Sequence, residues 1–254
     1  MNILASAASG VRAQQVALDA LADNLANLNT FGFKAERASF SETITQVRHL
    51  VQPAGEKTGE PLVVGSGVQL AGVDRSTLPG IVSESENPYS LAIQGEGYFR
   101  VRQPDQSVAY TRAGNFSRDA TGLLVDEHGN SLEPALWIAA GADIRIEEDG
   151  RVLETDEDGV HEYAQLTLTR FSNGGDLQRI GDNLFQPAGN TTIITGAPGS
   201  DGLGRILAGH VERSSVELGK TMTDMIQVQR AYQMNARMIR NGDEMWSTAN
   251  ALRR

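Results

Sequence analysis

The chain of 254 residues contains no cysteine. This absence excludes disulfide bonds, thiolate catalysis and cysteine-ligated zinc. Histidine is scarce as well, because only four are present and no two of them stand four residues apart, as a zinc-binding helix would require. We therefore predict no metal site.

Long apolar runs are also missing. No stretch approaches the roughly 20 apolar residues that a helix needs to cross a membrane. The segment Ala5-Ser6-Ala7 resembles a signal-peptide cleavage site, but no positive charge precedes it and the apolar stretch before it is short. We expect neither membrane insertion nor a cleaved signal peptide.

Familiar catalytic motifs are absent too. There is no glycine-rich phosphate loop ending in Lys-Ser or Lys-Thr and no His-Glu-x-x-His, and Gly65-Ser66-Gly67 lacks the spacing of a nucleophile elbow. The acidic run 154–159 resembles a calcium loop, but Gln165 stands where a bidentate glutamate should close the site. A solvated hairpin turn is the better interpretation. We predict no catalytic residue, no cofactor and no enzymatic activity.

Proline and glycine are nearly confined to the middle of the chain. All eight prolines lie between residues 31 and 210, and so do 24 of the 27 glycines. The same middle carries a net charge of −11, whereas the two ends together carry +1. Nucleic-acid binding needs a basic face, so this acidic body argues against a nucleic-acid partner.

At both ends, apolar residues recur at every seventh position. This is the spacing of a helix that packs along another helix in a coiled coil. The first end contributes Leu4, Val11, Leu18, Leu21, Leu25 and Leu28. The second end contributes Leu218, Met222, Met225, Val228, Tyr232, Ile239 and Trp246. We predict that these two sets form an assembly interface.

Two arrangements satisfy this pattern. The terminal helices could pair as an antiparallel hairpin within one monomer, or many copies could bundle laterally. We favour lateral bundling, because the repeat alternates large and small residues and ends in the bulky Trp246. We expect that a single helix pair would not hide so long an apolar seam.

The middle of the chain is predicted to be β. Short apolar runs alternate with turn signals such as Asp-Gly, which favours tight hairpins. The predicted strands are Ser90–Ile93, Tyr98–Arg102, Ala109–Thr111, Leu123–Val125, Ile144–Ile146, Val152–Glu154 and Leu166–Phe171. The predicted fold class is α+β, with discontinuous N- and C-terminal coiled-coil helices flanking a mainly antiparallel β domain. The predicted domains are a helical assembly domain (1–30 and 215–254), an extended connector (31–75 and 205–214) and an outer β domain (76–204).

Four ordered motifs resemble those of the bacterial flagellar rod and hook proteins. They are Asn24-Leu25-Ala26-Asn27 with Thr30 and Gly32-Phe33-Lys34, the segment 91–99, Tyr110-Thr111-Arg112, and Met225-Ile226 with Gln229-Arg230-Ala231-Tyr232. The resemblance spans essentially the whole chain. Within the family, two features favour the distal rod over a proximal rod or hook member. They are the chain length and the connector at residues 47–55, which resembles the connector of distal rod proteins.

The resemblance implies a structural subunit of the basal-body rod, the hollow drive shaft that carries motor torque to the hook. It implies helical self-assembly as a homo-oligomer, contact with other rod proteins, the hook protein and the surrounding ring (bushing) proteins, and export through the flagellar secretion channel into the cell envelope. It assigns the helix exit and connector to Asn27, Thr30, Gly32, Phe33, Gln52 and Pro53. A different class stays open as well: a carbohydrate-binding or hydrolytic β protein dimerised by its helices.

Overall fold

The computed structural model describes residues 2–43, 46–48, 62–64, 67–76, 79–139, 142–156, 159–172, 177–189 and 191–252. Two helices flank an antiparallel β region, which confirms the predicted α+β class. Two compact units divide the chain. Unit 1 comprises Met1–Ala26, Glu36–Asp74 and Glu217–Arg254, and unit 2 comprises Asn27–Ala35 and Arg75–Val216.

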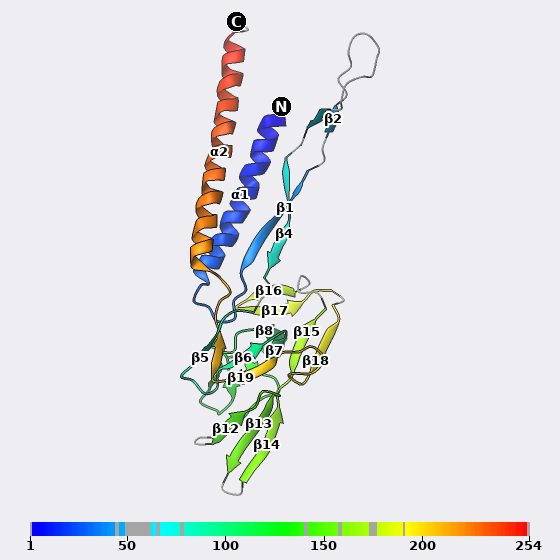
Figure 1. Cartoon of the computed structure of the whole chain (residues 1–254), viewed down its shortest axis with the longest axis vertical. Helices are drawn as coiled ribbons and strands as arrows, with labels where there is room; N and C mark the ends of the chain where they lie inside the picture. The colour runs from blue at the N-terminus through cyan, green and yellow to red at the C-terminus, as the bar shows by residue number, and fades with distance from the viewer. Residues whose placement is uncertain are drawn as a thin grey trace. The chain divides into compact units, whose positions relative to one another are not determined.

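Unit 1 contains the helices α1 (Asn2–Ala26) and α2 (Leu218–Ala251), which pack side by side (Figure 1). They run antiparallel, because Gly10 faces Asn235 and Gly242 faces Leu4. Antiparallel pairing within one chain, the arrangement that we did not favour, is therefore present. α1 ends at Ala26. Leu28, which we predicted to belong to the helical repeat, therefore lies beyond the helix.

A two-stranded ribbon completes unit 1. Strands β1 (Glu36–Glu42) and β4 (Val68–Arg75) pair, as do β2 (Gln46–Arg48) and β3 (Leu62–Val64). β1 packs on α1, and the Asn24 side chain exchanges two hydrogen bonds with the backbone of Glu36, at 2.7 and 2.8 Å. Much of the segment predicted as an extended connector therefore belongs to the helical unit.

The largest sheet of unit 2 is antiparallel throughout its described pairings. Its order is β16 (Leu177–Gly181), β17 (Leu184–Pro187), β8 (Val108–Thr111), β7 (Tyr98–Arg102), β11 (Ser131–Leu132), β10 (Leu124–Val125) and β9 (Ser117–Arg118). β15 (Leu168–Phe171) also pairs with β7 and carries β18 (Ile193–Gly196) on its other side.

Three smaller antiparallel sheets complete unit 2. One has the order β12 (Asp143–Ile146), β13 (Arg151–Asp156) and β14 (Gly159–Gln165). The other two pair β19 (Arg205–Ala208) with β6 (Leu91–Gln94), and β20 (His210–Glu212) with β5 (Val82–Glu84). Asp156 pairs with Gly159, as the predicted hairpin requires. The strands β6, β7, β8, β10, β12, β13 and β15 overlap predicted ones, whereas β5, β9, β11, β14 and β16 to β20 of unit 2 were not predicted.

Apolar side chains cover both faces of the main sheet. One face carries the larger cluster, which includes Phe99, Val101 and Leu168. The other face carries a smaller aromatic cluster in which the rings of Tyr110 and Phe171 lie 4.9 Å apart in an edge-to-face arrangement. Leu168 and Phe171 of β15 are both buried although they belong to opposite faces, because each face has a core of its own.

Candidate assembly surface and exit segments

α1 buries small residues rather than its predicted leucines. Ala7, Ala13, Ala20 and Asn24 are the buried residues among the described part of this helix. The predicted residues Leu4, Val11, Leu18, Leu21 and Leu25 are half-buried. Ala7, Ala13 and Ala20 are small enough to let neighbouring elements approach the helix closely.

α2 is far more exposed. Among its described residues, Thr221 alone is buried. Four predicted interface residues are half-buried, namely Met225, Val228, Tyr232 and Ile239. The other three are exposed: Leu218 (44%), Met222 (51%) and Trp246 (53%). Trp246 lies one turn beyond Gly242, which faces Leu4 near the start of α1, so the repeat continues past the partner helix.

Further exposed apolar side chains on α2 were not predicted. They are Ile226, Met234, Met238, Met245 and Leu252. The spacing of four, seven and seven residues from Met234 to Leu252 places those four side chains on one face of the helix. We call this face, Met234, Met238, Met245 and Leu252, the methionine face. Its periodicity is present in the sequence, but the prediction followed a single heptad register and so missed it.

The predicted helix-exit residues lie in a tight turn of unit 2. Thr30 donates to Asn27 through its backbone N–H and its hydroxyl, each at 3.2 Å. Gly32 has φ +67°, and a Cβ there would lie 2.6 Å from the backbone nitrogen of Ala113, so no other residue fits without displacing the chain. Phe33 is buried. Gln52 and Pro53 lie outside the described residues.

Three charged side chains meet behind this turn. The Glu212 carboxylate accepts hydrogen bonds from the Lys34 ammonium, from Arg112 Nε at 2.8 Å, and from the Gly80 backbone N–H at 2.6 Å. Lys34 and Arg112 are each 5% exposed, and Glu212 is 1% exposed. Such deep burial of charge is tolerated only when the groups are paired and hydrogen-bonded.

Arg112 extends this cluster into the core of unit 2. Its guanidinium donates to the carbonyl oxygens of Gly97 at 2.7 Å, Gly95 at 2.5 Å and Ile93 at 3.3 Å. The residue directly follows β8, so one side chain joins this strand to the turn between β6 and β7.

Burial and neighbouring charges both shift the pKa values of Glu212 and Lys34. Burial would raise the pKa of Glu212, but the charges of Arg112 and Lys34 and their hydrogen bonds outweigh it and lower that pKa below its ordinary value of 4.5. Burial lowers the pKa of Lys34, and the nearby charge of Arg112 lowers it further against the opposing attraction of Glu212. The carboxylate therefore stays ionised at neutral pH.

Backbone hydrogen bonds hold the neighbouring segments together. Gly32 N–H donates to the Glu212 carbonyl at 2.7 Å, and Ser215 N–H donates to the Phe33 carbonyl at 3.0 Å. Ala35 N–H donates to Ser215 Oγ at 2.9 Å. We call the segments 31–35 and 212–215, with Lys34, Arg112 and Glu212, the exit clasp. The sequence motifs contained Lys34 and Arg112, but no local signal pointed to Glu212 as their partner.

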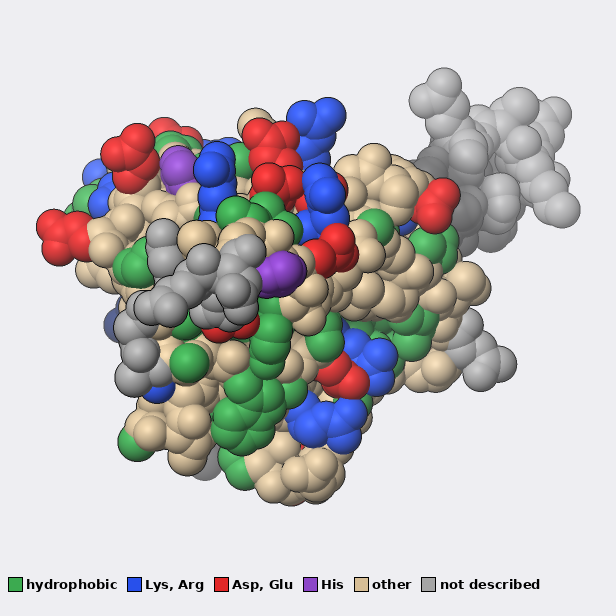
Figure 2. Space-filling view, turned by 90° about the horizontal axis from the view of Figure 1, so that it is seen from below, with side chains coloured by type: hydrophobic (Ala, Val, Ile, Leu, Met, Phe, Trp, Pro, Cys, Tyr) green, Lys and Arg blue, Asp and Glu red, His purple; other side chains and the backbone are tan. Residues whose placement is uncertain are grey.

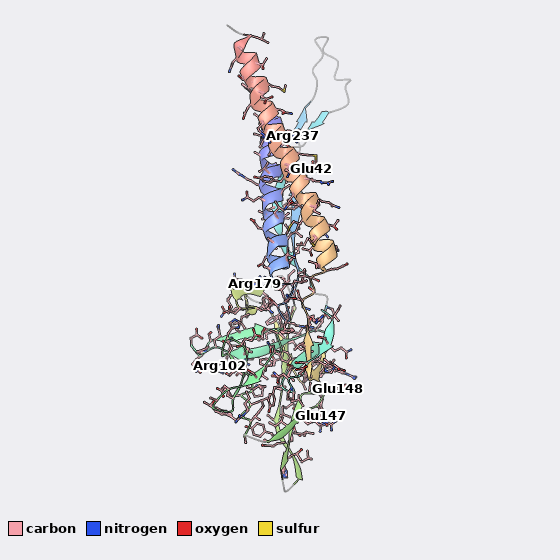
Figure 3. The ribbon with its side chains drawn as sticks, turned by 90° about the vertical axis from the view of Figure 1, so that its left-hand side faces the viewer. Glu42, Arg102, Glu147, Glu148, Arg179 and Arg237 are labelled. Carbon is pink, nitrogen blue, oxygen red and sulfur yellow. The ribbon has the colours of Figure 1, made fainter. Side chains whose placement is uncertain are left out.

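Charges on the surface of unit 2 are mixed. Arg151 pairs with Glu147 at 2.9 Å and with Asp149 at 2.7 Å, and Arg205 pairs with Glu148 at 3.1 Å. Glu147 and Glu148 begin the turn between β12 and β13 (Figure 3). Figure 2 shows acidic and basic side chains interspersed on one face of the molecule, with apolar side chains between them. The excess of acid thus does not form a field of one sign on this face.

No group of three or more histidine, aspartate or glutamate side chains is placed to hold a metal ion within the described part of the chain. Over the same residues, none of the helices has the length and apolarity needed to span a membrane.

Comparison with known protein families gives three matches along the chain. Residues 4–34 match the flagella basal body rod protein family, residues 92–160 match the flagellar hook protein FlgE/F/G D1 domain, and residues 207–252 match the flagellar basal body rod FlgEFG protein C-terminal family. The three matches stand in the order of the motifs found in the sequence.

Curated relatives match over the full length. The flagellar basal-body rod protein FlgG of Caulobacter vibrioides is 37% identical over all of this chain and all of its own. FlgG of Borreliella burgdorferi is 38% identical over all of this chain and 99% of its own. FlgF of Caulobacter vibrioides is 29% identical over 91% of this chain and 89% of its own. With matched helical ends, a matched D1 segment and full-length relatives, the chain belongs to the flagellar rod and hook protein family and is most similar to its FlgG rod proteins.

Proposed function

We propose that this chain is a structural subunit of the distal rod of the flagellar basal body, and that copies of it assemble helically into a hollow shaft that carries motor torque to the hook. The relatives at 33–38% identity over nearly their whole length are flagellar basal-body rod proteins FlgG. The lower identity of the FlgF relative supports the distal rod over a proximal one.

The observation that carries the proposal is the exposed apolar surface of α2. A helix of 34 residues has one buried residue among those described, while Met234, Met238 and Met245 are 50–73% exposed. Fully burying one such side chain contributes about 1.5–3 kcal/mol. Contiguous apolar surface of this kind marks a protein–protein interface.

Helical assembly would bury the exposed apolar side chains of α2. The paired helices leave the methionine face of α2 unused, so this face is free for neighbouring copies. A contact that is repeated with a fixed rotation that does not close generates a filament. The predicted residues Met225, Val228, Tyr232 and Ile239 would then serve the helix pair, and Leu218, Met222 and Trp246 the contacts between copies.

The proposed partners and location follow from the same reading. Other rod proteins and the hook protein would abut this subunit in the shaft, and the surrounding ring would face unit 2. The subunit would reach the basal body through the flagellar secretion channel, without a cleaved signal peptide.

The test is a pair of matched substitutions on α2 in the bacterium that carries this chain. Met238→Asp places a charge on the methionine face, and Gln233→Asp places the same charge at another exposed position five residues earlier. Both purified proteins should have unchanged circular dichroism and unfolding midpoints, because both positions are solvent-exposed in the single chain. Met238→Asp should abolish rod assembly and swimming, because an unpaired buried charge is costly.

Gln233→Asp should assemble and swim as the wild type does. Equal motility of the two variants would contradict the proposed assembly surface. Absence of the wild-type chain from isolated basal bodies, probed by electron microscopy with a label on this chain, would contradict the proposed function itself.

A further inference from the structure

We propose that the exit clasp is a load-sharing joint, in which Lys34, Arg112 and Glu212 are positioning residues that hold both exits of unit 2 side by side as one rigid element. The inference rests on the proposed function in one respect: the load is the torque that a rod subunit would carry. The joint itself is a property of the single chain.

The residues of the joint come from distant parts of the sequence and lie where the chain enters and leaves unit 2. Lys34 and Glu212 are 178 positions apart, yet their side chains bond directly. Unit 2 begins or ends at residues 27, 35, 75 and 216. The clasp lies within a few residues of each of these points, because Ser76 N–H also donates to the Ala35 carbonyl at 2.9 Å. Force entering unit 2 along either exit therefore reaches the same cluster.

Glu212 joins three separate segments of unit 2. Its carboxylate accepts hydrogen bonds from Lys34, Gly80 and Arg112. Breaking a buried ion pair is strongly unfavourable, although forming one adds little net stability over an apolar contact. Unit 2 already has two apolar cores. A buried ion cluster placed at the exits thus fits a need for one fixed geometry better than a need for more stability.

Arg112 ties the joint to the interior. Three of its donor hydrogen bonds end on the carbonyl oxygens of residues 93–97, between β6 and β7. β7 carries Phe99 and Val101 in the larger core. A pull on the exits is thereby passed to the turn that leads directly into β7, a central strand of the main sheet.

A positioning role and a merely stabilising role differ in where the protein opens. If the exits open only when the whole unit unfolds, a substitution in the core raises exchange at the exit amides as much as loss of the cluster does. If the cluster alone holds the exits, they open locally, and their exchange responds to loss of the cluster but not to loss of a core contact, because local and global opening have separate free energies. The amide hydrogens of Gly32, Ala35 and Ser215 report the exits, and those of Phe99 and Val101 report the core.

The experiment measures hydrogen exchange on the full chain carrying Glu212→Gln. The matched control is Glu148→Gln, which removes a carboxylate from the exposed Arg205 pair. We expect Glu212→Gln to raise exchange at the three exit amides roughly tenfold or more. A variant of the core, Phe99→Ala, should raise exchange at the Val101 amide but leave the exit amides within about twofold of their wild-type rates. The control should leave both sets unchanged. An equal rise at the exit amides in Glu212→Gln and Phe99→Ala, or no rise at the exits in Glu212→Gln, would overturn the proposal.

A milder variant covers the case in which Glu212→Gln does not fold. Lys34→Met leaves the Arg112–Glu212 pair charge-balanced, so it should fold and show a smaller rise in exchange at the exit amides. Lys34→Arg keeps the charge and should restore most of the protection. Failure of Lys34→Arg to improve on Lys34→Met would also overturn the role of the ion cluster.

A second readout tests the load. Cells carrying Lys34→Met should build rods of normal number and length, yet their flagella should rotate more slowly than those of Glu148→Gln cells in viscous medium. Equal speeds under load would overturn load sharing. If the chain is absent from rods, the proposed function fails, but the exchange result still decides whether the clasp holds the exits.

Discussion

Units 1 and 2 differ in what they bury. The largest fully buried side chains of the chain are phenylalanine, leucine and isoleucine residues of unit 2, such as Phe99, Phe116 and Leu124. The buried residues described in unit 1 are alanines, Asn24 and Thr221, and its large apolar side chains are half-buried or exposed. One unit encloses its core within a single chain, whereas the other leaves large apolar side chains exposed.

The cause lies in their geometry. The main sheet of unit 2 covers both of its faces with apolar clusters, so the unit encloses its own core. Unit 1 consists of two long helices and a narrow ribbon, and two elements side by side can shield only the surface between them. The comparison predicts that substitutions in unit 2 act on the stability of the chain, whereas those in unit 1 act on assembly.

The largest effect is expected at the centre of unit 2. Phe99→Ala removes a fully buried ring that packs against Phe116 with ring centroids 5.5 Å apart. The free energy of unfolding should fall by about 3–5 kcal/mol, because the substitution loses apolar transfer free energy and leaves a cavity. Urea titration followed by near-ultraviolet circular dichroism measures this. A loss below about 1 kcal/mol would remove the contrast between the two units.

Glu212→Gln should have the next largest effect, and one that depends on pH. At pH 7 this substitution should lower the free energy of unfolding by about 3 kcal/mol, because Lys34 and Arg112 remain buried but lose the neighbouring carboxylate charge. The folded protein holds the pKa of Glu212 below 4.5, so the stability due to this group is present above that pH and is lost as pH falls through the lower, folded value.

The difference in the free energy of unfolding between wild type and Glu212→Gln should therefore shrink when the urea titrations are moved from pH 7 to pH 3. Glu148→Gln, at an exposed pair, serves as the control and should show little difference at either pH. A difference that stays constant over this range would show that ionisation of Glu212 does not contribute to stability.

The smallest effect on the single chain is expected on the methionine face. Met234→Ala changes a side chain that is 61% exposed, so the free energy of unfolding should change by less than about 0.5 kcal/mol. Rod length in cells should nevertheless fall, because a contact between copies is lost. A large destabilisation of the purified chain would show that unit 1 completes its own core after all.

Much of this protein can be read from its residues. Proline and glycine are scarce at both ends and apolar residues recur there every seventh position, which is enough to determine two long helices. Turn signals and short apolar runs determine the β body, and Tyr98–Arg102 was predicted to its ends. The motif around Gly32, together with three other motifs, indicated the family.

Other features depend on contacts that no local pattern encodes. Strands such as β14 and β16 have little apolar character of their own and form because they pair with neighbours. The heptad repeats could not show which apolar side chains remain uncovered, because that depends on the antiparallel stagger that leaves Trp246 beyond α1. Glu212 could not be assigned to Lys34 and Arg112, since a single ion pair across 178 positions has no periodicity. Local periodicity determined the elements, and the long-range packing of the tertiary structure decided their partners.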